Sequence, residues 1–135
     1  MGKKGGNRRS AKTRRIGEAL EILASLNVPR EQQNERSALV LLALLGMTPR
    51  KSWSSATDPL LGITEMMNVF RDQFGKHYAP NTRETVRRFT VHQFVQMGLV
   101  IANPDNPQRP VNSPANRYQV APCLLYTSPS PRDRQ

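Results

Sequence analysis

The pattern of apolar and polar positions predicts a series of short helices over most of the chain. Apolar residues recur at helical spacing over residues 16–26, and a second helix is predicted over residues 30–45. The second helix contains eight consecutive apolar residues, 38–45, so we expect it to be buried on almost every side. A third helix begins at or just before Thr64 and ends at Gly75, because glycine readily adopts the left-handed conformation that closes a helix.

The fourth predicted helix runs from Asn81 to Gly98 and has two different faces. Asn81 and Glu84, behind Pro80, have the spacing of a capping box, in which each side chain bonds the backbone amide of the other residue. One face is apolar and should meet the core, and its residues are Val86, Phe89, Thr90, Phe94 and Met97. The opposite side is the polar face, which consists of Asn81, Thr85, Arg88 and His92.

After Gly98 the period of the pattern changes from that of a helix to that of a strand. Residues 99–101 and 117–120 are predicted strands, and the proline-rich loop 103–116 separates them. Upstream, a helix, a turn of four residues (76–79) and a second helix form a helix-turn-helix signature. The predicted fold is therefore mainly α with a small β-hairpin, a winged helix-turn-helix of about four helices followed by a two-stranded wing.

The polar face has the chemistry of a helix that reads the major groove of DNA. Arginine can bond a guanine edge through two hydrogen bonds, asparagine can bond adenine, and threonine can meet a phosphate or a thymine methyl group. The same face can equally belong to an ordinary amphipathic helix whose polar side meets water. The loop 103–116, with Arg109 inside it and Arg117 after it, is open to two interpretations as well. It can contact phosphates or the minor groove, or it can be a rigid surface loop.

The net charge of +10 is concentrated at the N-terminus. Residues 1–17 carry +7 with no acidic residue, whereas residues 18–122 carry +2 and residues 123–135 carry +1. The segment 1–15 is rich in glycine, lysine, arginine and serine, and we expect it to be a disordered basic arm. Such an arm can follow phosphates or enter a minor groove, and it can also be a solvated tail. The folded domain is then expected over residues 16–122.

Several other kinds of site are not expected. Cys123 is the only cysteine, so neither an internal disulfide nor a cysteine-based metal site can form. His77 and His92 have no third ligand at a fixed spacing, so no metal site is predicted. Trp53 is expected to cover the core with its indole N–H bonded, because no second aromatic lies near it to form a base-stacking platform. No apolar run is long enough to span a membrane and no signal peptide follows the basic start, so we expect a cytoplasmic protein without a membrane partner.

The last residues, 123–135, resemble the translation of a transposase adapter used to build sequencing libraries. They begin Cys-Leu-Leu-Tyr-Thr-Ser-Pro-Ser-Pro-Arg-Asp and follow directly after the second predicted strand. We therefore interpret this segment as a sequencing artefact and set it aside. On this interpretation the chain is a fragment of a longer protein.

Four groups of local motifs together point to a known family, and the resemblance covers roughly residues 27–120. They are Gln33-Asn34-Glu35-Arg36-Ser37-Ala38 with Leu41-Leu42-Ala43-Leu44-Leu45-Gly46, then Asn81-Thr82-Arg83-Glu84-Thr85-Val86-Arg87-Arg88, then His92-Gln93-Phe94-Val95-Gln96, and finally Asn103-Pro104-Asp105 with Arg109-Pro110-Val111-Asn112-Ser113-Pro114. With these motifs the sequence resembles the N-terminal helix-turn-helix domain of the BsuBI/PstI family of type II restriction endonucleases. The motifs are specific as a set, whereas any one alone is weak.

The resemblance implies a restriction enzyme that cuts duplex DNA at the palindromic site CTGCAG with Mg²⁺, using a C-terminal nuclease domain of the PD-(D/E)xK type. No Asp…Glu-x-Lys cluster is found in this chain, because Glu84 is followed by Thr85 and Val86. We therefore expect the fragment to lack a catalytic site and a cofactor of its own. A homodimer is possible and would form through the missing domain. What remains is a module that binds duplex DNA. The residues expected to contact it are Asn81, Thr82, Arg83, Thr85, Arg87, Arg88, His92 and Arg109.

Two other functions stay open at this point. A stand-alone winged-helix transcription regulator would end near Val120 with a dimerisation helix, and no such helix is visible in the sequence. A domain that docks on the nuclease domain would use the same arginine and asparagine side chains without reading DNA.

Overall fold

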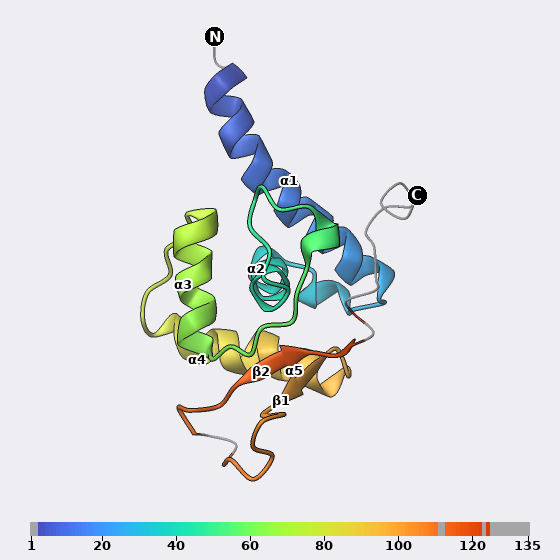
Figure 1. Cartoon of the computed structure of the whole chain (residues 1–135), viewed down its shortest axis with the longest axis vertical. Coiled ribbons are helices and arrows are strands. Elements are labelled where there is room, and N and C mark those ends of the chain that lie inside the picture. The colour runs from blue at the N-terminus through green and yellow to red at the C-terminus, as the bar shows by residue number, and fades with distance from the viewer. Residues whose placement is uncertain (1–2, 111–112, 123, 125–135) are drawn as a thin grey trace.

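The computed structural model describes residues 3–110, 113–122 and 124, with side chains from residue 11 onward in those ranges. The helices gather around one central helix, and a two-stranded hairpin closes one end of the body (Figure 1). The main elements are α1 (Lys3–Ser25), α2 (Glu35–Leu44), α3 (Ile63–Phe74), α4 (Thr82–Val86), α5 (His92–Gln96), β1 (Val100–Ala102) and β2 (Tyr118–Val120). A π-helical segment, Arg87–Val91, joins α4 to α5 without a break.

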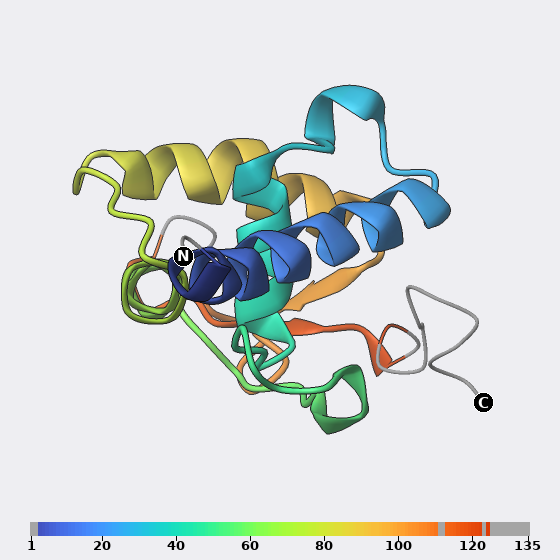
Figure 2. The same cartoon turned by 90° about the horizontal axis from the view of Figure 1, so that it is seen from above.

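The central element is α2, in which residues 37–44 are all buried. It begins where the Asn34 side chain accepts a hydrogen bond from the backbone amide of Ser37 at 2.9 Å, which satisfies one of the free amides of the first turn. The other helices and β2 pack around it, and α1 crosses it (Figure 2). The prediction of a helix buried on almost every side is confirmed. Its start lies at Glu35, because residues 30–32 form a separate 3₁₀ turn.

The first helix begins at Lys3, well before the position predicted from the apolar pattern. The segment 3–15 is therefore helical, which corrects the prediction of a disordered arm over residues 1–15 for this part, and residues 1–2 lie outside the described residues. The physical reason lies at Arg15, whose side chain is only 8% exposed. Its guanidinium donates to Glu18 at 2.5 Å and to the carbonyl oxygen of Pro49 at 3.2 Å, and it lies 5.6 Å from the centre of the Trp53 ring. These contacts hold a basic residue of the expected arm in helical geometry.

Trp53 covers the core as predicted. It packs against the buried cluster, and its indole N–H donates to Glu18 Oε1 at 2.8 Å. The same carboxylate also accepts from Arg15, so one acidic side chain ties α1 to the loop after α2.

The helix over residues 82–96 differs from the prediction in its phase. Val86, Thr90 and Phe94 are buried as expected, but Phe89 is 54% exposed and Val91 is buried in its place. A π-helical turn contains about one residue more than an α-helical turn, so the residues inside it are displaced around the axis. Phe89 is therefore removed from the predicted apolar face. The left-handed Gly98, with φ of 79°, closes the helix as predicted.

The predicted capping box is wrong. Asn81 already has helical dihedral angles (φ −72°, ψ −10°), and its side chain makes no capping hydrogen bond. The carboxylate of Glu84 bonds the Arg87 side chain one turn later. A charge-assisted contact within the helix thus replaces the expected contact with the backbone amide of Asn81.

The hairpin is antiparallel, and its register pairs Val100 with Val120 and Ala102 with Tyr118. Val100, Val120 and Tyr118 are buried against the helical body. Tyr118 also exchanges two backbone hydrogen bonds with Leu61, at 2.8 and 3.0 Å, so the hairpin is joined to the loop that leads into α3. The predicted wing is confirmed. Of the adapter-like segment 123–135, only Leu124 lies within the described residues, where it belongs to the core.

No helix among the described residues is long and apolar enough to cross a membrane.

We expect Leu42→Ala to lower the free energy of unfolding by about 2–5 kcal/mol, because it leaves a cavity in the core beside α2, on which α1, α3, the segment 87–91 and β2 pack. The measurement is urea unfolding followed by circular dichroism. The exposed Glu21 of α1 provides the control, and Glu21→Ala should change stability by no more than about 0.5 kcal/mol. Equal effects of the two substitutions would contradict a central role for α2.

Candidate nucleic-acid interface

The helix-turn-helix consists of α3, the connecting segment 75–81 and the helix over residues 82–96. This last helix is called the second helix of the motif, or simply the second helix, from here on. Gly75 adopts the left-handed conformation with φ of 67°, and the amide of Lys76 donates to the carbonyl oxygen of Phe70 at 2.8 Å. This pairing closes the last turn of α3. The Tyr78 ring then packs edge-on against Phe70, with the ring centres 5.9 Å apart. The connecting segment is thereby fixed to α3, and it sets the direction in which the next helix starts.

The polar face of the second helix is open to solvent. Asn81, Arg88 and His92 are exposed, and Thr85 is half-buried. His92 Nε2 lies 3.2 Å from Gln96 Nε2, so its ring contacts the next turn of the same helix. Of the four residues that the pattern placed on one side, three are therefore exposed and one is half-buried, whereas Val86 and Phe94 are buried in the core.

Arg88 differs from the other arginines of this region. Its guanidinium lies 5.8 Å from the centre of the neighbouring Phe89 ring. Within the part of the chain that the structure describes, it forms no hydrogen bond or ion pair. Arg88 therefore has its donors available for an external partner.

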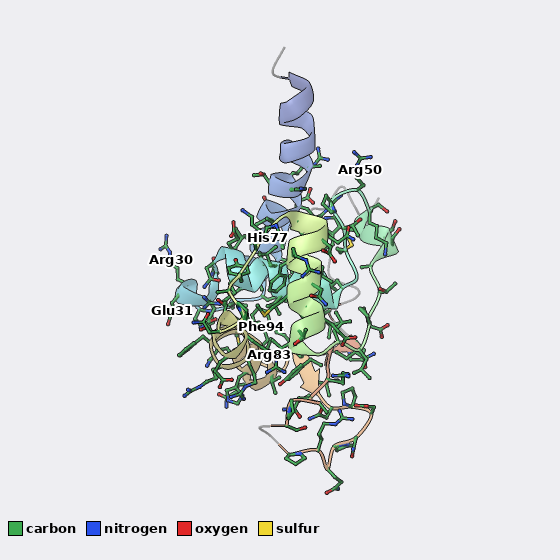
Figure 3. The ribbon with its side chains drawn as sticks, turned by 90° about the vertical axis from the view of Figure 1, so that its left-hand side faces the viewer. Arg30, Glu31, Arg50, His77, Arg83 and Phe94 are labelled. Atoms are coloured by element: carbon green, nitrogen blue, oxygen red, sulfur yellow. The ribbon has the colours of Figure 1, made fainter. Side chains whose placement is uncertain are left out.

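Arg83 and Arg87 are engaged by the fold. Arg83 Nε donates to Thr64 Oγ1 at 3.1 Å, and its Nη2 donates to the carbonyl oxygen of Pro114 at 3.5 Å. Arg83 thus lies beside the first turn of α3 and reaches the wing (Figure 3). Arg87 bonds Glu84, and this hydrogen bond lowers the pKa of the Glu84 carboxyl. The charge of Arg87 is therefore partly balanced by its neighbour.

The wing is held by a network around Asn103, which is buried although it lies in a loop. Its side-chain oxygen accepts from Arg109 Nη1 and from the amide of Arg117, both at 2.8 Å, and its Nδ2 donates to Asn116 Oδ1 at 3.0 Å. Arg109 also pairs with Asp105, and that hydrogen bond lowers the pKa of the carboxyl. Arg109 therefore has a structural role, and its predicted contact with phosphate stays a prediction.

A notch lies between the second helix and the wing. It has a volume of about 250 Å³, and Arg87 and His92 line it from the helix while Arg109 and Tyr118 line it from the wing. Burial raises the pKa of the Tyr118 hydroxyl further above neutral, so Tyr118 adds no charge of its own beside Arg109. The structure thus brings Arg109 of the wing beside Arg87 and His92 of the predicted site.

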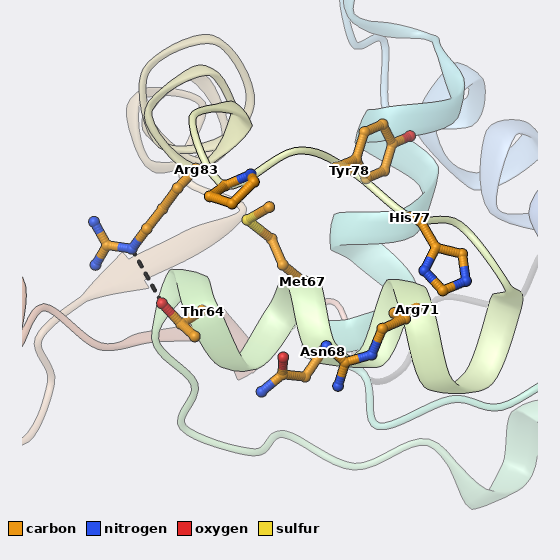
Figure 4. A pocket seen from close by; sticks show the side chains of 8 residues that line it. Thr64, Met67, Asn68, Arg71, His77, Tyr78 and Arg83 are labelled. Atoms are coloured by element: carbon orange, nitrogen blue, oxygen red, sulfur yellow. Dashed lines mark hydrogen bonds between the residues drawn. The ribbon is translucent and has the colours of Figure 1, made fainter.

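Sequence reasoning did not single out the polar side of α3. A pocket of about 270 Å³ lies between α3 and the start of the second helix (Figure 4). Thr64, Asn68 and Arg71 line it from α3, and Arg83 closes the other side. Their spacing of four and then three residues places the first three on one side of the helix. That polar stripe was the available signal, because the first helix of such a motif crosses the DNA backbone.

Among the described residues, no group of three or more histidine, cysteine, aspartate or glutamate side chains could hold a metal ion.

A helix-turn-helix followed by a two-stranded antiparallel hairpin defines the winged helix-turn-helix class. The chain belongs to the BsuBI/PstI restriction endonuclease HTH domain family, whose model matches residues 13–126. The resemblance seen in the sequence is thereby confirmed.

Known relatives support this assignment. The chain is 57% identical over 105 residues to the type II restriction enzyme BsuBI of Bacillus subtilis, a match that covers 78% of this chain. It is 43% identical over 109 residues to the type II restriction enzyme AplI of Arthrospira platensis, covering 81% of this chain. In each case the match spans 33% of the relative. The solved structure of the SdaI restriction endonuclease is also similar, with a TM-score of 0.76 and 34% sequence identity. The match covers 79% of this chain and 34% of the SdaI chain.

We expect Asn103→Gly to loosen the wing. Glycine tolerates the φ of 52° at this position, so the substitution removes the hydrogen bonds of the Asn103 side chain without adding backbone strain. The free energy of unfolding should fall by about 1–3 kcal/mol, and the amide of Arg117 should exchange with solvent faster. Hydrogen exchange measured by NMR tests this. Gln108→Ala, in an exposed part of the same loop, is the control and should leave that amide protected.

Proposed function

We propose that this chain binds duplex DNA by inserting the polar face of the helix over residues 82–96 into the major groove, as the N-terminal domain of a type II restriction endonuclease. The observation that carries this proposal is the exposure of Arg88 with no hydrogen bond or ion pair among the described residues, on a helix whose opposite side is buried in the core. A guanidinium held in this way can donate two parallel hydrogen bonds to the O6 and N7 atoms of guanine.

The remaining residues of the polar face have complementary roles. Asn81 lies at the start of the helix and can bond an adenine edge, and Thr85, one turn later, can meet a phosphate or a base. Arg83 and Arg87 are already bonded within the domain. Both suit phosphate contacts, which position a protein on the duplex. Such a contact does not require a guanidinium whose donors are all free for two parallel hydrogen bonds. Thr82 and His92, at the two ends of the exposed surface, complete the proposed contact.

The flanking elements supply further contacts to the DNA backbone. Asn68 and Arg71 of α3 are exposed beside the second helix, where a phosphate strand would pass. Arg71 bonds Asp72, which is also exposed, so this pair is open to exchange for a phosphate. On the other side, the wing brings Arg109 to the edge of the notch.

We assign cleavage to the part of the relatives that this chain does not cover. The relatives are named type II restriction enzymes, and the chain spans 33% of their length. The Mg²⁺-dependent nuclease chemistry and the two-fold arrangement implied by a palindromic CTGCAG site would belong to that remaining part. This chain would contribute recognition and positioning and would need no cofactor to bind DNA.

We expect Arg88→Ala to weaken binding to a CTGCAG duplex by about 1–3 kcal/mol and to leave binding to a scrambled duplex nearly unchanged. Fluorescence anisotropy with the two duplexes at one salt concentration measures both affinities. Arg50 is an exposed arginine near α1, away from Arg83 and the second helix (Figure 3), so Arg50→Ala is the matched control. Equal losses on both duplexes would show that Arg88 contacts phosphate only.

Binding should also weaken steeply with salt, because each neutralised phosphate releases counterions and contributes about 0.9 to the slope of log K against log salt concentration. We expect Arg71→Ala to reduce that slope by about one, equally on both duplexes. A titration from about 50 mM to about 200 mM NaCl measures it. Wild-type chain that shows no salt-dependent binding to duplex DNA would overturn the proposed function.

A further inference from the structure

Phe89 is exposed at a place where the sequence pattern predicts burial. It is the most exposed of the three large apolar side chains on the described surface, at 54% against 40% for Ile101 and 36% for Leu60. Its two neighbours toward the C-terminus, Thr90 and Val91, are both fully buried. The π-helical segment over residues 87–91 produces this arrangement, because its extra residue brings Val91 into the core and turns Phe89 outward.

We propose that Phe89 is a specificity-determining residue that covers the C5-methyl group of a thymine in the major groove. This inference rests on the proposed function, because it requires the second helix to enter that groove. The methyl group is the one apolar feature that the major-groove edge of a base pair presents, and apolar side chains recognise it by contact.

The surroundings of Phe89 favour this role. Arg88, immediately before it, is exposed and has its guanidinium over the Phe89 ring, 5.8 Å from the ring centre. Thr85, one turn earlier, belongs to the polar face. The ring therefore borders the surface that we propose reads bases. A hydrogen-bond donor and an apolar surface lie side by side, as is needed to read a guanine edge next to a thymine. The contact with Arg88 also restricts the rotamers of both side chains, so less conformational entropy is lost on binding.

A protein-docking surface is the competing explanation for an exposed aromatic ring. Such surfaces are extended apolar patches. The other two exposed apolar side chains come from different elements, since Leu60 precedes α3 and Ile101 lies on β1. Directly beside Phe89 on the helix is a charged residue, Arg88. A single ring beside charged and polar side chains fits a DNA groove better than a protein interface.

The test compares a CTGCAG duplex with one in which every thymine is replaced by uracil, a change that removes only the methyl groups. We expect the wild-type chain to bind the uracil duplex more weakly, by about fourfold for each methyl group that the ring covers. Phe89→Ala should bind the thymine duplex with a similar loss and should no longer distinguish the two duplexes. Phe89→Leu should keep part of the discrimination, because it keeps an apolar contact.

Ile101→Ala is the matched control, since it removes an exposed apolar side chain from the wing strand and should leave the discrimination intact. Urea unfolding of each variant confirms that it is folded, which the exposure of both positions leads us to expect. Equal wild-type affinity for the two duplexes would overturn the inference and leave the proposed function standing. So would full discrimination by Phe89→Ala. Unchanged affinity of Phe89→Ala for both duplexes would overturn it as well, and would point to protein docking. A wild-type chain that binds neither duplex would overturn the inference together with the proposed function.

Discussion

The structure depends on the burial of α2 on all sides. A helix with no polar face has to be surrounded, and here α1, α3, the helix over residues 82–96 and β2 all pack on it. Each surrounding helix buries one side against α2 and leaves its other side free. A hydrogen bond also joins α2 to the helix over residues 82–96, since Arg36 of α2 donates to the buried hydroxyl of Thr90 at 2.8 Å. The orientation of the polar face toward solvent is therefore a consequence of how the core is filled.

Most of the fold could be predicted from the sequence, because strong local signals agree with the packing. The apolar run over residues 38–45, the left-handed glycines at 75 and 98 and the alternating strands all have one dominant interpretation. The phase of the second helix could not be predicted. Phe89 and Val91 are both apolar, so the sequence allows either to fill the core, and only the folded structure shows that Val91 does. The helix before Ile16 was missed because Arg15 gains its contacts from residues 18, 49 and 53.

The sequence predicted which residues lie on the surface of the candidate site better than it predicted which of its arginines are bonded within the fold. Spacing alone places Asn81, Thr85, Arg88 and His92 on one side, and the structure leaves three of them exposed and Thr85 half-buried. Spacing does not show which arginines the fold itself employs. Arg83 and Arg109 are bonded by Thr64, Pro114 and Asn103, which come from other elements or from the far end of a loop. Such partners are visible only once the chain is folded. They separate the arginines that the fold employs from Arg88, which forms no hydrogen bond or ion pair among the described residues.

The placement of α1 has a consequence for how the molecule meets a polyanion. With 23 residues, this helix is about 34 Å long, and its basic start points away from the end of the body that carries the second helix and the wing (Figure 1). Since charges separated by more than about 8 Å are largely screened at physiological ionic strength, the two ends act as separate electrostatic sites. If the chain binds duplex DNA as proposed, the far end would in dilute buffer attract duplexes in an orientation that presents no groove-reading surface. Moderate salt would suppress these misoriented encounters and so favour complexes that form through the helix-turn-helix.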